Sequence, residues 1–134
     1  MFVENLKKVL FLLPLLGISL AIILLSNQAT FDLPVWNIFG FDKVAHLSAF
    51  FAYGLCVQFA YKGIVNTPLK KKAILYTILI SALFGASDEI HQYFVPGRTC
   101  DVFDFIADIT GASISLFLIS TNKKIVNYIK LRLK

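Results

Sequence analysis

The chain has 134 residues, of which 57% are apolar and 16% are charged, and its formal net charge is +5. Soluble domains carry about 45–50% apolar and about 25% charged residues, so this composition excludes intrinsic disorder and indicates a single-domain integral membrane protein. The two cysteines exclude a disulfide scaffold. The basic residues stand in short clusters beside apolar runs, without a nucleic-acid-binding motif, so we expect no nucleic-acid partner.

Apolar runs along the chain predict membrane helices, each of which needs about 20 mainly apolar residues. The first run follows Lys7 and Lys8, exceeds the length of a signal-peptide core and has no A-x-A cleavage site after it, so we expect a retained helix. The predicted spans are residues 9–26, 44–61, 73–94 and 101–120. Long apolar runs without alternation argue against strands. The fold class is therefore an all-α membrane protein, a four-transmembrane-helix bundle.

Lysine and arginine concentrate in three segments, which sets the expected orientation. These residues are Lys7 and Lys8; Lys62, Lys70, Lys71 and Lys72; and Lys123, Lys124, Lys130, Arg132 and Lys134. The two remaining loops offer only Lys43 and Arg98. Four spans place all three rich segments on one side, and the positive-inside rule makes that side the cytoplasm. We therefore expect a multi-pass protein with both termini cytoplasmic and with membrane lipids as partners.

Two flanking segments suggest contacts with the membrane surface. Trp36, Phe39 and Phe41 suit the outer interface, where aromatic side chains gather. Residues 123–134 mix Lys and Arg with Ile, Val and Leu, which is typical of a basic amphipathic helix on the inner leaflet. A frayed charged tail explains the same pattern equally well.

Polar residues converge at the predicted outer ends of the last three spans. Six of the eight acids lie there: Asp42, Asp88, Glu89, Asp101, Asp104 and Asp108. The same ends carry His46, His91, Gln92, Lys43 and Arg98. Such a surplus of acids over fixed cations leaves carboxyls protonated or demands an external cation. Intramembrane charges usually mark function, and the alternative is a satisfied polar network that holds three helices together.

Helical spacing predicts how deep these side chains lie. At a rise of about 1.5 Å per residue, Glu89 lies roughly 8 Å and Asp108 roughly 10 Å below the outer ends of their helices. Asp104 shares a face with Asp108, and His46 lies about one turn below Asp42. We therefore expect His46, Glu89, Asp104 and Asp108 to line one cavity that opens to the outer face. Small residues continue inward on the same faces, which allows close helix packing.

The order D-K-x-x-H at residues 42–46, D-E-x-x-Q at 88–92, P-G-R at 96–98 and then Asp104 resembles the VanZ-like family of small bacterial membrane proteins. The resemblance covers about residues 40–121, and the family takes its name from a protein associated with teicoplanin resistance. It implies a bacterial plasma-membrane protein with an envelope function. The residues that match the family pattern are Asp42, Lys43, His46, Glu89, Gln92, Arg98 and Asp104. Two positions depart from it: Asp108 stands where many relatives have Asn, and Ser115 replaces the second Gly of a G-x-x-x-G, which would loosen packing.

Our leading hypothesis is binding or modification of a lipid headgroup, a lipid-linked cell-wall precursor or a glycopeptide antibiotic such as teicoplanin. The arginine fork would grip phosphate or carboxylate. The candidate catalytic residues are Glu89 and His46 as general bases, with Arg98 and Asp104. The candidate binding residues are Asp42, Lys43, Asp88, His91, Gln92 and Asp108. Whether the protein is an enzyme stays open.

Three alternatives use the same residues. A non-catalytic divalent-metal site is one, with His46, Glu89, Asp104 and Asp108 as candidate ligands, since carboxylates with histidine suit such ions. Docking of another membrane protein is the second. A small proton- or cation-coupled transporter is the third, but the acids stop in the outer half of the predicted spans. The sequence therefore names one candidate cofactor, a divalent metal ion, without fixing its identity.

Overall fold

The structure of the protein is a computed structural model that describes residues 2–28, 40–65 and 70–133, with side chains at 6–28, 40–65, 71–118 and 123–133. Its elements are α1 (Phe2–Ser26), α2 (Phe41–Ile64), α3 (Lys70–Tyr93), α4 (Val102–Ser115), the 3-10 turn η2 (Leu116–Leu118) and α5 (Ile119–Arg132). These residues contain no strand, so the all-α class is confirmed for the part of the chain that is described. The interface residues proposed at Trp36 and Phe39 lie outside it.

Three described helices are long and apolar enough to cross a membrane, over Leu6–Ser26, Phe41–Ile64 and Lys71–Tyr93. The predicted fourth span ends early. The 14 residues of α4 reach about 21 Å along the axis, whereas a hydrocarbon core is about 30 Å thick. The chain then bends by 64° between Val102–Leu118 and Lys123–Arg132, and it crosses a fourth time only if this bent pair forms one span.

Local backbone conformation and side-chain capping explain where α2 and α4 begin. Gly40, at φ +84°, precedes α2 in a backbone conformation that favours glycine. The side chain of Asp101 caps α4 by accepting a hydrogen bond from the Phe103 N–H. A turn follows α3 at Pro96-Gly97: Gly97 has φ +81°, and the Arg98 N–H donates to the Val95 carbonyl over 3.1 Å, as in a type II turn.

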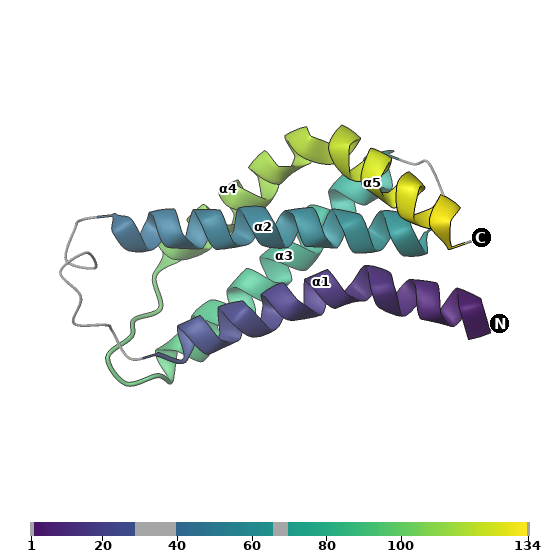
Figure 1. Cartoon of the computed structure of the whole chain (residues 1–134). Helices are drawn as coiled ribbons and strands as arrows, with labels where there is room; N and C mark the ends of the chain where they lie inside the picture. Colours follow the sequence, from purple (N-terminus) through teal and green to yellow (C-terminus); the bar gives the residue numbers. More distant parts are fainter. Residues whose placement is uncertain (1, 29–39, 66–69, 134) are drawn as a thin grey trace.

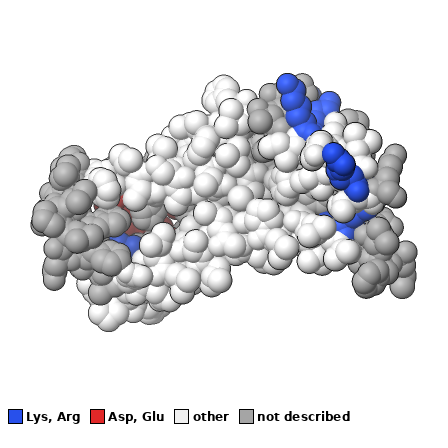
Figure 2. All heavy atoms as spheres, in the orientation of Figure 1, with Lys and Arg blue, Asp and Glu red and all other residues white. Residues whose placement is uncertain are grey.

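Helix α2 lies at the centre of the bundle and packs against the other four helices (Figure 1). The first residues of α1 and the last residues of α5 lie at one end. The last residues of α1, the first residues of α2 and the loop from α3 to α4 lie at the other. Lys and Arg side chains gather at the end where α5 finishes, and a small acidic patch is visible at the opposite end (Figure 2). The two ends of the bundle thus differ in charge, although Lys43 lies among the acids of the second end.

The contact between α2 and α4 is close because small residues line it. A Cβ on Gly111 would overlap the Leu47 carbonyl oxygen and lie 2.9 Å from the Phe51 nitrogen. Ser115, which was expected to loosen this packing, lies inside the contact. Its side chain is fully buried, donates to the Ala112 carbonyl over 2.6 Å and accepts from Gln58 over 2.8 Å. The serine therefore stands at the position of a second glycine with a hydroxyl that both donates and accepts a hydrogen bond.

An aromatic core lies directly beside the polar end. The rings of Tyr53 and Phe84 stack with centroids 4.6 Å apart, and Phe50 is completely buried against Tyr53. A Cβ on Gly85 would lie 3.3 Å from Phe50 and 2.9 Å from an Asp108 carboxylate oxygen. The missing side chain at Gly85 therefore leaves room for a buried carboxylate next to the aromatic rings.

Candidate functional site

Four side chains at the start of α2 and α4 form the lysine cluster, defined as Asp42, Lys43, Asp101 and Asp104. The Lys43 ammonium donates to the carboxylates of Asp42, Asp101 and Asp104 over 2.9, 2.8 and 2.9 Å. These bonds use all three of its donors. Asp104 is buried, at 8% side-chain exposure, while the other three are about one third exposed or more. When all four groups are ionised the cluster carries two net negative charges.

One helical turn deeper along α2 lies the histidine triad, defined as His46, Glu89 and Asp108. His46 Nδ1 is 2.9 Å from Asp108 Oδ1 and 3.9 Å from Glu89 Oε1. One ligand atom from each residue lies within 4.8 Å of the others. The triad is well buried, with side-chain exposures of 11% for His46, 5% for Glu89 and 0% for Asp108. Three different helices therefore bring an imidazole and two carboxylates to one point.

Asp101 connects the lysine cluster with the histidine triad. Its backbone N–H donates to Glu89 Oε2 over 2.8 Å, while its side chain accepts from Lys43 and from the Phe103 N–H. The hydrogen bond from Lys43, followed by that from Phe103, holds the pKa of Asp101 below its ordinary value. The start of α4 thus fixes the relative position of both groups.

Several polar atoms at this end are buried without a hydrogen-bond partner among the described residues. They are Glu89 Oε1, Asp108 Oδ2, Asp88 Oδ1 and Arg98 Nε. Leaving a buried polar group unsatisfied costs about 1–3 kcal/mol, and more for a charged group. Acceptors and a donor are both unsatisfied here, so the end of the bundle has binding capacity for groups of either sign.

Two of the predicted site residues, Gln92 and His91, contact the end of α1. Gln92 donates to Asp88 over 2.9 Å and to Ser26 over 3.4 Å. A ring nitrogen of His91 is 2.9 Å from the Asn27 side-chain oxygen. Asp88 and Gln92 thus bond to each other along one face of α3, whereas Glu89, the residue after Asp88, accepts from the Asp101 N–H. The contacts with Ser26 and Asn27 join α3 to the end of α1.

Arg98, predicted to grip an anion, lies half-buried in the loop between α3 and α4. Within the described residues its guanidinium forms no ion pair with an acid, and its Nε is buried without a partner. It stands three residues before Asp101, which limits their Cα separation to about 11 Å. The arginine is therefore near the lysine cluster in the chain and is not neutralised by it.

Sequence reasoning missed Gln58. This side chain is completely buried in α2, donates to Ser115 over 2.8 Å and leaves its Oε1 without a partner among the described residues. The sequence did contain a sign of this site: a polar amide inside an apolar run is costly in a membrane, so Gln58 could have been expected to have a partner. It extends the polar surface between α2 and α4 beyond Asp108.

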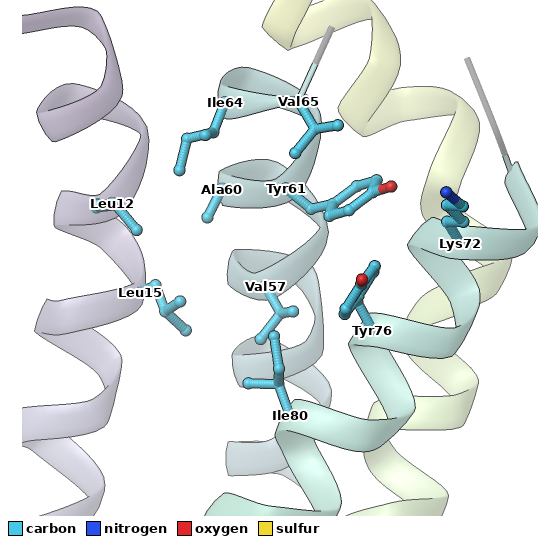
Figure 3. A pocket seen from close by; sticks show the side chains of 10 residues that line it. All are labelled: Leu12, Leu15, Val57, Ala60, Tyr61, Ile64, Val65, Lys72, Tyr76 and Ile80. Atoms are coloured by element: carbon cyan, nitrogen blue, oxygen red, sulfur yellow. The ribbon is translucent and has the colours of Figure 1, made fainter. Parts of the chain in front are cut away.

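An apolar groove of about 400 Å³ lies between α1, α2 and α3, at the end opposite the clusters (Figure 3). The rings of Tyr61 and Tyr76 stack on one of its walls, with centroids 5.4 Å apart. Among the described residues that line it, only Lys72 is charged. No predicted site residue contributes to this groove.

The fold and the site together define a helical membrane protein with buried acidic and histidine groups at one end of its bundle. The VanZ/LLP1 family profile matches residues 1–125. The chain belongs to this family, and the resemblance read from its motifs is confirmed. It is also similar to an uncharacterized protein of the fission yeast Schizosaccharomyces pombe, 33% identical over 78 residues, which are 58% of this chain and 45% of that protein. The match thus spans less than half of that relative, and no solved structure matches the chain.

Proposed function

We propose that the protein binds, at the polar end of its bundle, the headgroup of a membrane-embedded molecule that carries an amine together with a phosphate or carboxylate. The observation that carries this proposal is the buried Arg98 Nε, which has no partner among the described residues and stands three residues before a cluster in which three carboxylates surround one lysine. Groups of both signs are available within one small region. A ligand with both charges satisfies them together.

The anionic half of the ligand is assigned to Arg98. A guanidinium binds phosphate or carboxylate through two parallel hydrogen bonds, and within the described residues this arginine has no acid that would compete. Lys43 is a weaker candidate, because its three donors are already used by Asp42, Asp101 and Asp104. The turn at Pro96-Gly97 places the arginine in the loop at the end of the bundle.

The cationic half is assigned to the lysine cluster. Its carboxylates outnumber the ammonium by two, and Asp42 and Asp101 are open to the outside of the bundle. An amine would reduce the repulsion between these acids. The headgroup of an amine-bearing phospholipid, a lipid-linked cell-wall precursor and a glycopeptide antibiotic such as teicoplanin all carry this chemistry. We place the site at the outer face of a bacterial plasma membrane, because the Lys- and Arg-rich segments belong at the cytoplasmic side.

The test is a binding titration of the full chain in detergent, with native mass spectrometry as the readout of bound probe. The probes are phosphatidylethanolamine, a lipid-linked cell-wall precursor, teicoplanin and, as a lipid with phosphate but no amine, phosphatidylglycerol. We expect at least one amine-bearing probe to bind more tightly than phosphatidylglycerol. Arg98→Lys should weaken that binding about tenfold, since lysine keeps the charge but loses the fork.

The matched control is Arg132→Lys, at the opposite end of the bundle. It should leave binding of every probe unchanged. Equal weakening by both variants, or no preference for an amine-bearing probe, would overturn the proposal. The probe whose binding is weakened by Arg98→Lys identifies the class of molecule that supplies the headgroup.

A further inference from the structure

We infer that the histidine triad of His46, Glu89 and Asp108 is a binding site for one divalent transition-metal ion, of the kind represented by Zn²⁺ and Mn²⁺. This inference goes beyond headgroup binding, because the triad lies deeper than the lysine cluster and all its ligands come from the chain. The ion would bind without any lipid present. It would join α2, α3 and α4 through one centre.

The distances fit such an ion. A tetrahedral site with ligands about 2.0–2.1 Å from the metal places its ligand atoms roughly 3.3 Å apart. The separations from His46 Nδ1 are 2.9 Å to Asp108 and 3.9 Å to Glu89, so they lie on either side of that value. Shifts of a few tenths of an ångström in these side chains would equalise them.

The buried carboxylates give the second, independent observation. Glu89 Oε1 faces His46 across the triad, and neither it nor Asp108 Oδ2 has a hydrogen-bond partner in the part of the chain that the structure describes. Both side chains are more than nine-tenths buried. Two carboxylates thus share one imidazole in a space from which water is largely excluded, and such acceptors are costly without a cation. A metal ion would satisfy them and replace the proton shared by His46 and Asp108.

The ligand set points to the class of ion. One imidazole nitrogen with two carboxylates suits Zn²⁺ and Mn²⁺, whereas Ca²⁺ takes six to eight oxygen ligands and Mg²⁺ keeps several waters. The lysine cluster also groups three carboxylates, at Asp42, Asp101 and Asp104. It is the weaker site, since the Lys43 ammonium already occupies its centre.

The experiment uses the full chain, purified in detergent and stripped with EDTA. Zn²⁺, Mn²⁺, Mg²⁺ and Ca²⁺ are each added alone, bound metal is counted by elemental analysis after dialysis, and thermal unfolding is followed in parallel. We expect one Zn²⁺ or Mn²⁺ per chain and a higher Tm with that ion, because a ligand of the folded state raises its stability. Asp108→Asn should weaken metal binding at least tenfold, since the isosteric amide is a poor ligand.

Two variants serve as controls with the same chemical change. Asp88→Asn alters a buried carboxylate at the same end of the bundle that pairs with Gln92, and Asp42→Asn alters the lysine cluster. Both should keep the full metal content. If Asp108→Asn fails to fold, Glu89→Gln and His46→Gln take its place with the same expectation. The inference would be overturned if the wild type bound no metal, if it bound only Mg²⁺ or Ca²⁺, or if the control variants lost as much metal as Asp108→Asn. Each of these results is independent of the lipid titration.

Discussion

Asp101 makes contacts in three directions, and these explain why the polar end has one defined geometry. Its N–H holds Glu89, one carboxylate oxygen accepts from Lys43 and the other caps α4 through Phe103. Each contact uses a different atom of the same residue. A change in the position of Lys43 would therefore shift the start of α4 and, through the Asp101 backbone, the histidine triad.

Replacing Lys43 by Gln should lower the stability of the folded protein most at neutral pH. Lys43 depresses the folded-state pKa of Asp101, so the stabilisation is present above the unfolded-state pKa of about 3.9. It is lost as the pH falls through the lower folded-state value. The Tm of the wild type should therefore decrease below about pH 4, the ordinary pKa of an aspartate, and the gap between wild type and Lys43→Gln should narrow there. Thermal unfolding in detergent from pH 3 to 7 measures both curves.

Lys124→Gln, an exposed lysine on α5, is the matched control for this titration. Its Tm should follow the wild type at every pH. A constant gap between wild type and Lys43→Gln across the whole range would show that Lys43 acts by packing and not through its ion pairs.

The sequence predicted part of the site because helix periodicity fixes depth and face. His46, Glu89 and Asp108 were expected at similar depth, and they lie together. Asp104 was expected in the same cavity but contacts Lys43. Asp104 and Asp108 are only one helical turn apart, and their spacing in the sequence does not show that they contact different groups. His91 could not be placed from the sequence, since its partner Asn27 depends on where α1 ends beside α3.

At the scale of the elements, the contact between α2 and α4 depends on the absence of a side chain at Gly111. Gly111→Ala should lower the free energy of unfolding by about 1–3 kcal/mol or more, the usual cost of overpacking. The reason is that the added Cβ meets backbone atoms of Leu47 and Phe51, which cannot rotate away. Thermal or denaturant unfolding in detergent measures the change.

Gly17→Ala is the control for Gly111→Ala. It is the same substitution inside a helix, but nothing lies within 4 Å of the added Cβ. Its stability should be unchanged or slightly raised, because alanine is the better helix former. If both variants unfold at the same temperature, the close approach of α2 and α4 does not contribute to stability.

Helix positions were predictable from apolar runs, but helix ends were less so. The second predicted span, residues 44–61, corresponds to the longer Phe41–Ile64, because polar residues such as Asp42 and Lys43 are accepted inside a helix when they pair with each other. The fourth, residues 101–120, was predicted as one helix but ends at Ser115. Hydropathy does not detect a bend at which apolar residues continue, and the chain turns at Leu116–Leu118 before its next helix.

At the scale of the whole molecule, opposite ends of the bundle carry opposite charge. The acidic clusters lie where α2 and α4 begin, and most Lys and Arg side chains lie where α5 ends (Figures 1 and 2). Basic segments usually stay on the cytoplasmic side. This arrangement supports the expectation that the clusters face outward, which a direct topology experiment can decide.

The two native cysteines make that experiment simple. Cys100 is exposed in the loop beside the acidic clusters, whereas Cys56 is half-buried in the middle of α2. A membrane-impermeant maleimide added to intact cells should therefore label the wild type, and Cys100→Ser should remove the labelling. Lys71→Cys in the Cys100→Ser background places an exposed thiol at the basic end, and it should react only after the membrane is permeabilised. The reverse pattern would invert the orientation, and labelling of both positions in intact cells would contradict a bundle whose two ends lie on opposite sides of the membrane.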